Sequence, residues 1–196
     1  MGRSDEGLTQ RSWRSDSPQM LGWSIGFAVA FMLAHWLTML LSPFFDVVTG
    51  KISLLYLPAF IRVVSIVVAG TAGVVGIAAG SALMGVLHHG DSVSFALSEA
   101  LAAAVAILLA HWLLCQAMRT RQLPITLWSL IALTAIYCTL NAVIHGTIWG
   151  VLDPVFEISP WKLALMMLGD LLGVIVMFGL LRVFVRTVRQ FKAFQN

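Results

Sequence analysis

The segment SLLYLPAFIRVVSIVVAGTAGVVGIAAGSALMGVLH, residues 53–88, decides the fold class of this chain. It is apolar almost throughout, and Arg62 is its one charged residue. A transmembrane helix needs about 20 residues, so the segment is too long for a single span. Gly70-Thr71-Ala72-Gly73 interrupts it, which predicts two short helices over 54–69 and 73–88. A re-entrant pair is the alternative, and in both cases the two ends face the same side of the membrane.

The composition of the whole chain supports a membrane protein. Of the 196 residues, 59% are hydrophobic and 11% are charged, and the mean hydropathy is +0.91. Soluble domains carry about 25% charged residues. The length leaves no room for an appended catalytic, nucleotide-binding or DNA-binding domain. Although the net charge is +3, the basic residues flank apolar runs and do not indicate nucleic-acid binding.

The predicted fold is an all-α polytopic transmembrane bundle of six spans. The second and third helices are the short pair described above, and Ser42-Pro43 ends the first helix. The other four helices are expected at 20–42, 93–118, 126–150 and 161–181. The chain then divides into three regions: a polar tail over 1–19, a six-helix transmembrane domain over 20–181 and a basic tail over 182–196.

The charges flanking these spans predict the orientation. Loops on the cytoplasmic side carry an excess of Lys and Arg. The basic residues lie before the first helix, between the fourth and fifth, and after the sixth: Arg3, Arg11, Arg14, Arg119, Arg121, Arg182, Arg186, Arg189 and Lys192. The loops at 43–52, 88–92 and 151–160 are mainly acidic and face outward. Both termini are therefore expected in the cytoplasm.

Charged, amide and imidazole side chains lie inside the apolar runs, where a charged side chain costs about 2.5–3.5 kcal/mol. At a rise of about 1.5 Å per residue, His111 lies near the inner face, whereas six others lie roughly 8–13 Å from the outer ends of their helices, in one layer. These candidate ligand-binding residues are His35, Arg62, Glu99, Asn141, His145 and Asp170.

Two interpretations of this layer remain open. The first is a ligand pocket open to the outside, in which Arg62 contacts an anionic or polar ligand. Glu99 and Asp170 then orient Arg62 or bind a cation or a proton. The second is an interhelical salt-bridge network that fixes helix packing, with Arg62 paired to one or both acids, because its planar fork suits a carboxylate.

No other pattern predicts catalysis, a metal or a cofactor. The chain has no recognisable catalytic constellation. His88-His89 beside Asp91 could suggest a metal, but adjacent residues point in different directions, so a solvated pair is favoured. Gly76 and Gly80 form a GxxxG pattern that allows close helix packing within the chain or, alternatively, dimerisation. Four aromatic residues are interpreted as interfacial anchors: Trp23, Tyr56, Trp149 and Trp161.

Several islands between 54 and 180 resemble the membrane-associated sensor (MASE-type) integral membrane domains of bacteria. Leu57-Pro58-Ala59 and the small-residue helix from Gly76 to Gly85 are similar to segments of that family. Residues 96–101 (ALSEAL) place Glu99 on the family's acidic position, and residues 168–173 (LGDLLG) are the most specific match.

The chain departs from the family in two respects: those sensors normally carry more spans and a cytoplasmic output domain, and Arg62 stands where many members are uncharged. It looks closer to small proteobacterial inner-membrane proteins without an output domain. The resemblance implies a sensor-like membrane module that passes its state to a protein partner. A small-solute transport component, similar to the substrate-binding subunits of energy-coupling-factor transporters, and a scaffold or assembly subunit are the alternatives.

Overall fold

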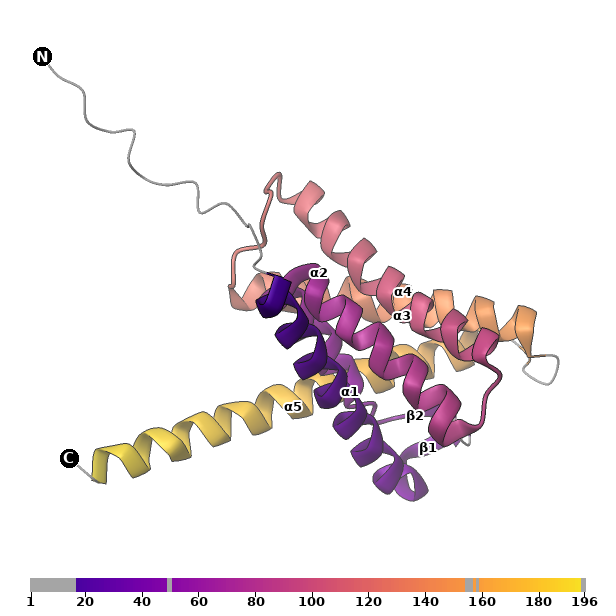
Figure 1. Cartoon of the computed structure of the whole chain (residues 1–196), viewed down its shortest axis with the longest axis horizontal. Helices are drawn as coiled ribbons and strands as arrows, with labels where there is room; N and C mark the ends of the chain where they lie inside the picture. Colours follow the sequence, from indigo (N-terminus) through magenta and orange to yellow (C-terminus); the bar gives the residue numbers. More distant parts are fainter. Residues whose placement is uncertain (1–16, 49–50, 154–156, 158, 195–196) are drawn as a thin grey trace, which may run out of the picture.

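A computed structural model describes residues 17–48, 51–153, 157 and 159–194 (Figure 1). Five helices follow one another along the chain: α1 (Ser17–Phe45), α2 (Pro58–Met84), α3 (Val93–Ala117), α4 (Leu127–Leu152) and α5 (Pro160–Phe194). A short π-helical turn, η1 (Gly85–His89), continues α2, and strands β1 (Asp46–Val48) and β2 (Ile52–Ser53) form a small antiparallel hairpin after α1. All five helices are long and apolar enough to cross a bilayer, so this is a multi-pass membrane protein.

The expected count of six spans is wrong, because residues 58–84 form one helical element. The interruption lies where the sequence places it: Gly70 has φ +57° and ψ −136°, which is outside the helical region. Helical backbone resumes at the next residue without a loop. The two expected short helices are therefore two arms of α2 joined at a single glycine.

The two arms of α2 run in opposite directions along α1. The Leu57 N–H at the start of α2 donates to Thr38 Oγ1 (3.1 Å), whereas Ser24 Oγ donates to the Ala72 carbonyl just after the break (2.8 Å). At the end of η1, His89 lies 3.0 Å from His35, with Nε2 facing Nε2. Because Thr38 and His35 both belong to the second half of α1, the two ends of the α2–η1 unit lie beside that half.

The GxxxG pattern serves contacts within the chain. A Cβ on Gly76 would collide with the Ser24 carbonyl of α1, and a Cβ on Gly80 would lie 2.8 Å from the Ala28 carbonyl. The absence of side chains at Gly76 and Gly80 therefore lets the second arm of α2 rest on the α1 backbone.

Two predicted boundaries are also wrong. α1 continues past Pro43 to Phe45, since a proline so close to the end removes only one of the last helical hydrogen bonds. α5 continues past residue 181 to Phe194, because no Gly or Pro follows Gly179 in its sequence. Most of the predicted N-terminal tail lies outside the described residues, and residues 17–19 already belong to α1.

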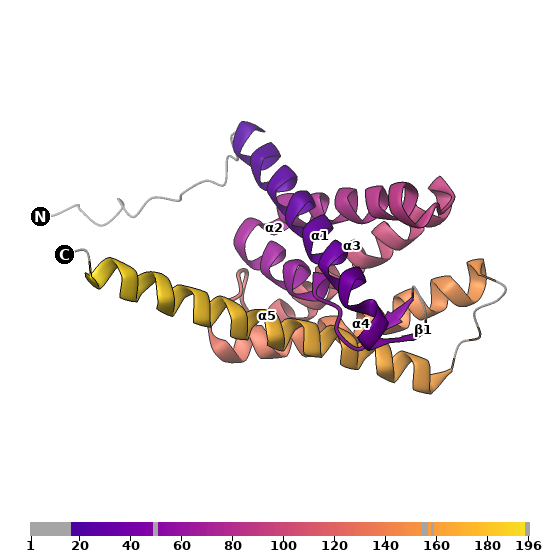
Figure 2. The ribbon, with the colours of Figure 1, turned by 90° about the horizontal axis from the view of Figure 1, so that it is seen from below.

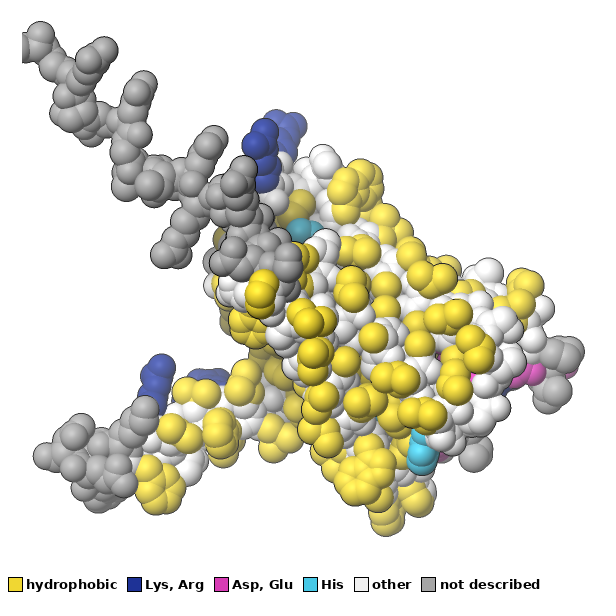
Figure 3. All heavy atoms as spheres, in the orientation of Figure 1, with side chains coloured by type: hydrophobic (Ala, Val, Ile, Leu, Met, Phe, Trp, Pro, Cys, Tyr) yellow, Lys and Arg dark blue, Asp and Glu magenta, His cyan; other side chains and the backbone are white. Residues whose placement is uncertain are grey.

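The apolar core lies between α2, α3, α4 and α5, and is built around Ala106, Ile107, Leu133 and Tyr137. α5 then leaves the other helices and extends alone toward the C-terminus (Figure 2). Apolar side chains are spread over the visible surface of the helices (Figure 3), as expected of a protein whose solvent is lipid. Lys and Arg gather where α3 meets α4 and where α5 ends, and acidic side chains appear at the opposite end (Figure 3). These are called the basic and acidic ends below.

Candidate functional site

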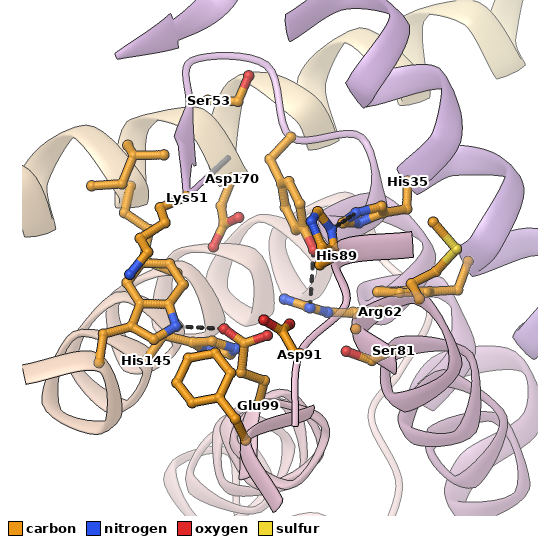
Figure 4. A pocket seen from close by; sticks show the side chains of 18 residues that line it. His35, Lys51, Ser53, Arg62, Ser81, His89, Asp91, Glu99, His145 and Asp170 are labelled. Atoms are coloured by element: carbon orange, nitrogen blue, oxygen red, sulfur yellow. Dashed lines mark hydrogen bonds between the residues drawn. The ribbon is translucent and has the colours of Figure 1, made fainter. Parts of the chain in front are cut away.

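A polar cavity of about 140 Å³ lies at the acidic end of the bundle (Figure 4). All five helices contribute to its wall, together with η1, β2 and the loops that follow them. Its titratable lining residues, Tyr56 apart, are His35, Lys51, Arg62, His89, Asp91, Glu99, His145 and Asp170. Aromatic rings complete the wall, from Phe31, Tyr56, Phe95 and Trp149.

The structure brings the six candidate residues together. His35, Arg62, Glu99, His145 and Asp170 line the cavity, and Asn141 lies directly behind Arg62. Four of the six are buried, with 0–5% of their surface exposed: Arg62, Asn141, His145 and Asp170. His35 and Glu99 are partly buried. That these residues bind a ligand remains a prediction.

Arg62 is held on one side only. Its Nη1 donates to Tyr137 Oη (2.9 Å) and to Asn141 Oδ1 (3.2 Å), and its Nη2 donates to Tyr56 Oη (3.2 Å). The Phe31 and Tyr56 rings each lie 5.3 Å from the guanidinium carbon, within cation–π range. A guanidinium has five N–H donors. The Nε–H and one Nη2–H therefore have no partner among the described residues, and the Nε atom is fully buried.

The acids do not pair directly with Arg62. Asp170 Oδ2 accepts from Asn141 Nδ2 (2.6 Å), and Glu99 Oε1 accepts from Trp149 Nε1 (2.5 Å). The salt bridge between Arg62 and an acid, which the second interpretation of the polar layer includes, is thus absent from the described part of the chain. Asn141 lies between the two charged groups instead. Its side-chain oxygen accepts from Arg62 and its side-chain nitrogen donates to Asp170, so the guanidinium and the carboxylate do not touch.

Two glycines of the LGDLLG segment bring Asp170 and Tyr56 to the cavity. A Cβ on Gly169 would meet the Ser53 carbonyl, and a Cβ on Gly173 would meet the Tyr56 carbonyl. The chain leading into α2 can therefore lie directly on α5, where the Tyr56 N–H donates to the Gly169 carbonyl (3.2 Å). Burial raises the pKa of the Tyr56 phenol, so its oxygen stays protonated and accepts from Arg62 while its own proton remains available.

The rim of the cavity is formed by loops at the acidic end. Lys51 forms an ion pair with Asp153, at the end of α4, and lies over the Trp149 ring. Gly90, with φ +69°, turns the chain after η1 so that Asp91 reaches the cavity. Within the described residues, no three His, Cys, Asp or Glu side chains come close enough together to hold a metal ion.

Sequence reasoning missed Tyr137 and misassigned Tyr56 and Trp149. Trp149 is 6% exposed and faces the cavity, so its interpretation as an interfacial anchor is wrong, as is that of Tyr56. Trp161, at 70% exposed, does lie on the surface. The sequence did contain a signal for Tyr137 and Trp149. Residues 137, 141, 145 and 149 are spaced by four and therefore share one face of α4, the face that carries Asn141 and His145.

No known protein family, no curated protein and no solved structure matches this chain. The resemblance to membrane-associated sensor domains therefore stays a prediction.

Proposed function

We propose that this protein is a sensor-like ligand-binding module of a bacterial inner membrane, with no catalytic output of its own. Its ligand is a small polar molecule that reaches the cavity from the acidic end, which faces outward. One observation carries the proposal: Arg62, 2% exposed, lines an accessible cavity with two of its N–H donors unused.

A purely structural role fits this geometry less well. Buried polar groups in folded proteins nearly always have a partner, and an unsatisfied buried donor costs about 1–3 kcal/mol. A network that served only to lock the helices would use the whole guanidinium. Here Tyr137, Asn141 and Tyr56 hold Arg62 in place at the cavity wall, and its Nε–H and one Nη2–H have no partner among the described residues.

The path of α5 supports a signalling role. Asp170 lies in the cavity, and the same helix continues without a break to the basic end. Its 35 residues correspond to about 52 Å, longer than the roughly 30 Å hydrocarbon core. A small displacement of Asp170 by a ligand is thereby carried to Arg182, Arg186 and Arg189. These arginines recur about every turn and suit a partner protein or anionic lipid on the cytoplasmic side.

The sequence resemblance favours the same class of protein. Glu99 and Asp170 fall in two of the segments that resemble membrane-associated sensor domains, and both residues line the cavity. The shared acidic positions thus coincide with the cavity wall.

The break at Gly70 favours a transport component as the second candidate. Non-helical backbone at membrane depth is typical of transporter substrate sites, where it lines a cavity. A helix that turns back at Gly70 is of this kind, although Gly70 itself is not a cavity residue. Reconstituted vesicles, tested with and without a pH gradient, would accumulate the ligand if the protein transports it alone.

Native mass spectrometry of the detergent-purified protein tests the binding proposal. We expect a bound species below one kilodalton on the wild type, lost in Arg62→Gln and kept in Arg182→Gln, which makes the same change on the exposed part of α5. If Arg62→Gln fails to fold, Glu99→Gln takes its place. A wild type that is empty, or a species retained by folded Arg62→Gln and Glu99→Gln, would contradict the proposal.

A further inference from the structure

The unused donors of Arg62 define one half of the ligand. N–H groups can only donate, so their partner must be an acceptor. A carboxylate is the acceptor that suits a guanidinium best, because hydrogen bonds between two charged groups are shorter and stronger than neutral ones. In Figure 4 the Arg62 side chain reaches into the middle of the cavity, where such a group would meet it.

The acids of the cavity define the other half. Three carboxyl groups line the wall, Asp91, Glu99 and Asp170, against two fixed cations, Arg62 and Lys51. Lys51 is already engaged by Asp153, which lies outside the wall. The carboxylates therefore outnumber the cations, and a simple anion would bind Arg62 against this excess. A positively charged group would instead offset it, with the Trp149 and Tyr56 rings beside it.

The volume limits the size of the ligand. The cavity volume of about 140 Å³ is close to the roughly 150 Å³ of a protein cavity that takes up benzene. A ligand that lies wholly inside the cavity is therefore about as large as benzene, and two opposite charges on such a molecule lie within a few bonds of each other.

We infer that the ligand is a small zwitterion of the amino-acid type, with its carboxylate on Arg62 and its ammonium on Glu99 and Asp170. This inference rests on the proposed function and adds the class of ligand to it. A zwitterion supplies the acceptor that Arg62 lacks and the cation that the acids lack, and it brings no net charge into the membrane. The rim gives it a path from the acidic end, since His89 is exposed and Asp91 is partly exposed.

Titration calorimetry on the full-length protein in detergent tests the inference with small probes. Glycine, alanine, serine, β-alanine and betaine are the zwitterions, and propionate and ethylamine are alanine without its ammonium and without its carboxylate. We expect at least one zwitterion to bind tenfold or more tightly than both single-charge probes, the ratio for one extra charge contact of about 1.4 kcal/mol. Propionate binding as tightly as alanine would overturn the inference but leave an Arg62 anion site and the proposed function intact. Ethylamine binding as tightly, or no binding by any zwitterion, would also overturn it, and the mass spectrometry above would then decide the proposed function separately.

Variants assign the ammonium end. Glu99→Gln and Asp170→Asn keep the shape of each side chain and should weaken binding of the zwitterion about tenfold, whereas binding of propionate should become tighter because each variant reduces the excess of carboxylates. Glu157→Gln is the matched control, since Glu157 is exposed and is not part of the cavity wall. Unchanged zwitterion affinity in whichever of the two cavity variants folds would overturn the placement of the ammonium.

Discussion

The two ends of the helix bundle use the same helices in opposite ways. Toward the basic end, α2, α3, α4 and α5 pack into a solid core in which Ala106, Ile107 and Leu133 have no exposed surface. Toward the acidic end, the same four helices, joined by α1, separate around a cavity lined by charged side chains. Tyr137 belongs to both, since its ring lies in the core and its hydroxyl holds Arg62.

This difference teaches that helix packing alone does not explain why the acidic end, called the hollow end below, contains a cavity. These helices can pack closely, as the alanines of α3 show in the core. The hollow end is kept open by polar side chains that cannot be buried against one another without partners. Variants that remove a charge or enlarge a side chain at one end or the other test whether polar side chains keep the cavity open.

Removing the Arg62 cation from the hollow end should have the largest effect on the stability of the protein. Arg62→Leu strips partners from Tyr137, Asn141 and Tyr56 and leaves Asp170 without a nearby positive charge. We expect a loss of roughly 3–5 kcal/mol in the free energy of unfolding, because the Asp170 charge is left uncompensated in the interior and three polar groups lose their partner. Adding Asp170→Asn should restore part of the loss, because the uncompensated charge is then gone. Chemical unfolding in detergent measures both, and equal stability of Arg62→Leu and the wild type would contradict the electrostatic account.

Enlarging a side chain should distinguish the solid end from the hollow one. Ala106→Leu adds volume where there is no room and should cost about 1–3 kcal/mol. Ser81→Leu adds a similar volume at the cavity wall and should cost less than about 1 kcal/mol, while it abolishes ligand binding. Thermal unfolding of the two variants gives the comparison, and a Ser81→Leu protein as damaged as Ala106→Leu would mean that the cavity is filled by protein in solution.

The turn of α2 offers a test at a single backbone position. A Cβ would meet nothing within 4 Å at Gly70 or at Gly22, so only the backbone conformation separates the two sites. Gly70→Ala should cost about 1–2 kcal/mol, because φ +57° with ψ −136° is accessible to glycine and strained for other residues. Gly22→Ala, in the helical interior of α1, should instead stabilise the protein by about 0.5–1 kcal/mol. Equal effects of the two alanines on the unfolding midpoint would argue against the reversal at Gly70.

The sequence predicted the membrane class, the position of the break in α2 and the set of polar residues that share a layer. These follow from properties that act locally: hydrophobic length, a glycine-rich interruption and the helical rise. The depth of Arg62, Glu99 and Asp170 could be counted along each helix, and the structure brings the three to one cavity.

The number of spans and the partners of each polar group could not be obtained in this way. Residues 71–73 do not indicate whether helix resumes at once or after a loop, because that depends on Ser24 of α1 contacting Ala72. The pairing of Arg62 with tyrosines and an amide in place of an acid depends on the rotation of α4 about its axis. Contacts between helices set that rotation, and no single helix encodes it.

The tryptophans give the smallest expected effect and test the rotation of α4 directly. Trp149→Phe keeps an aromatic ring in the wall but removes the N–H that Glu99 accepts, and should cost about 1 kcal/mol, the typical net value of one hydrogen bond. Trp161→Phe changes a side chain that is 70% exposed, so the unfolding free energy should move by less than about 0.5 kcal/mol. Because Trp149 shares its face of α4 with Asn141 and His145, a larger effect at Trp161 would mean that α4 turns another face to the cavity. Tryptophan fluorescence sharpens the result, since a zwitterion that fills the cavity should alter the emission of wild type and Trp161→Phe and leave that of Trp149→Phe unchanged.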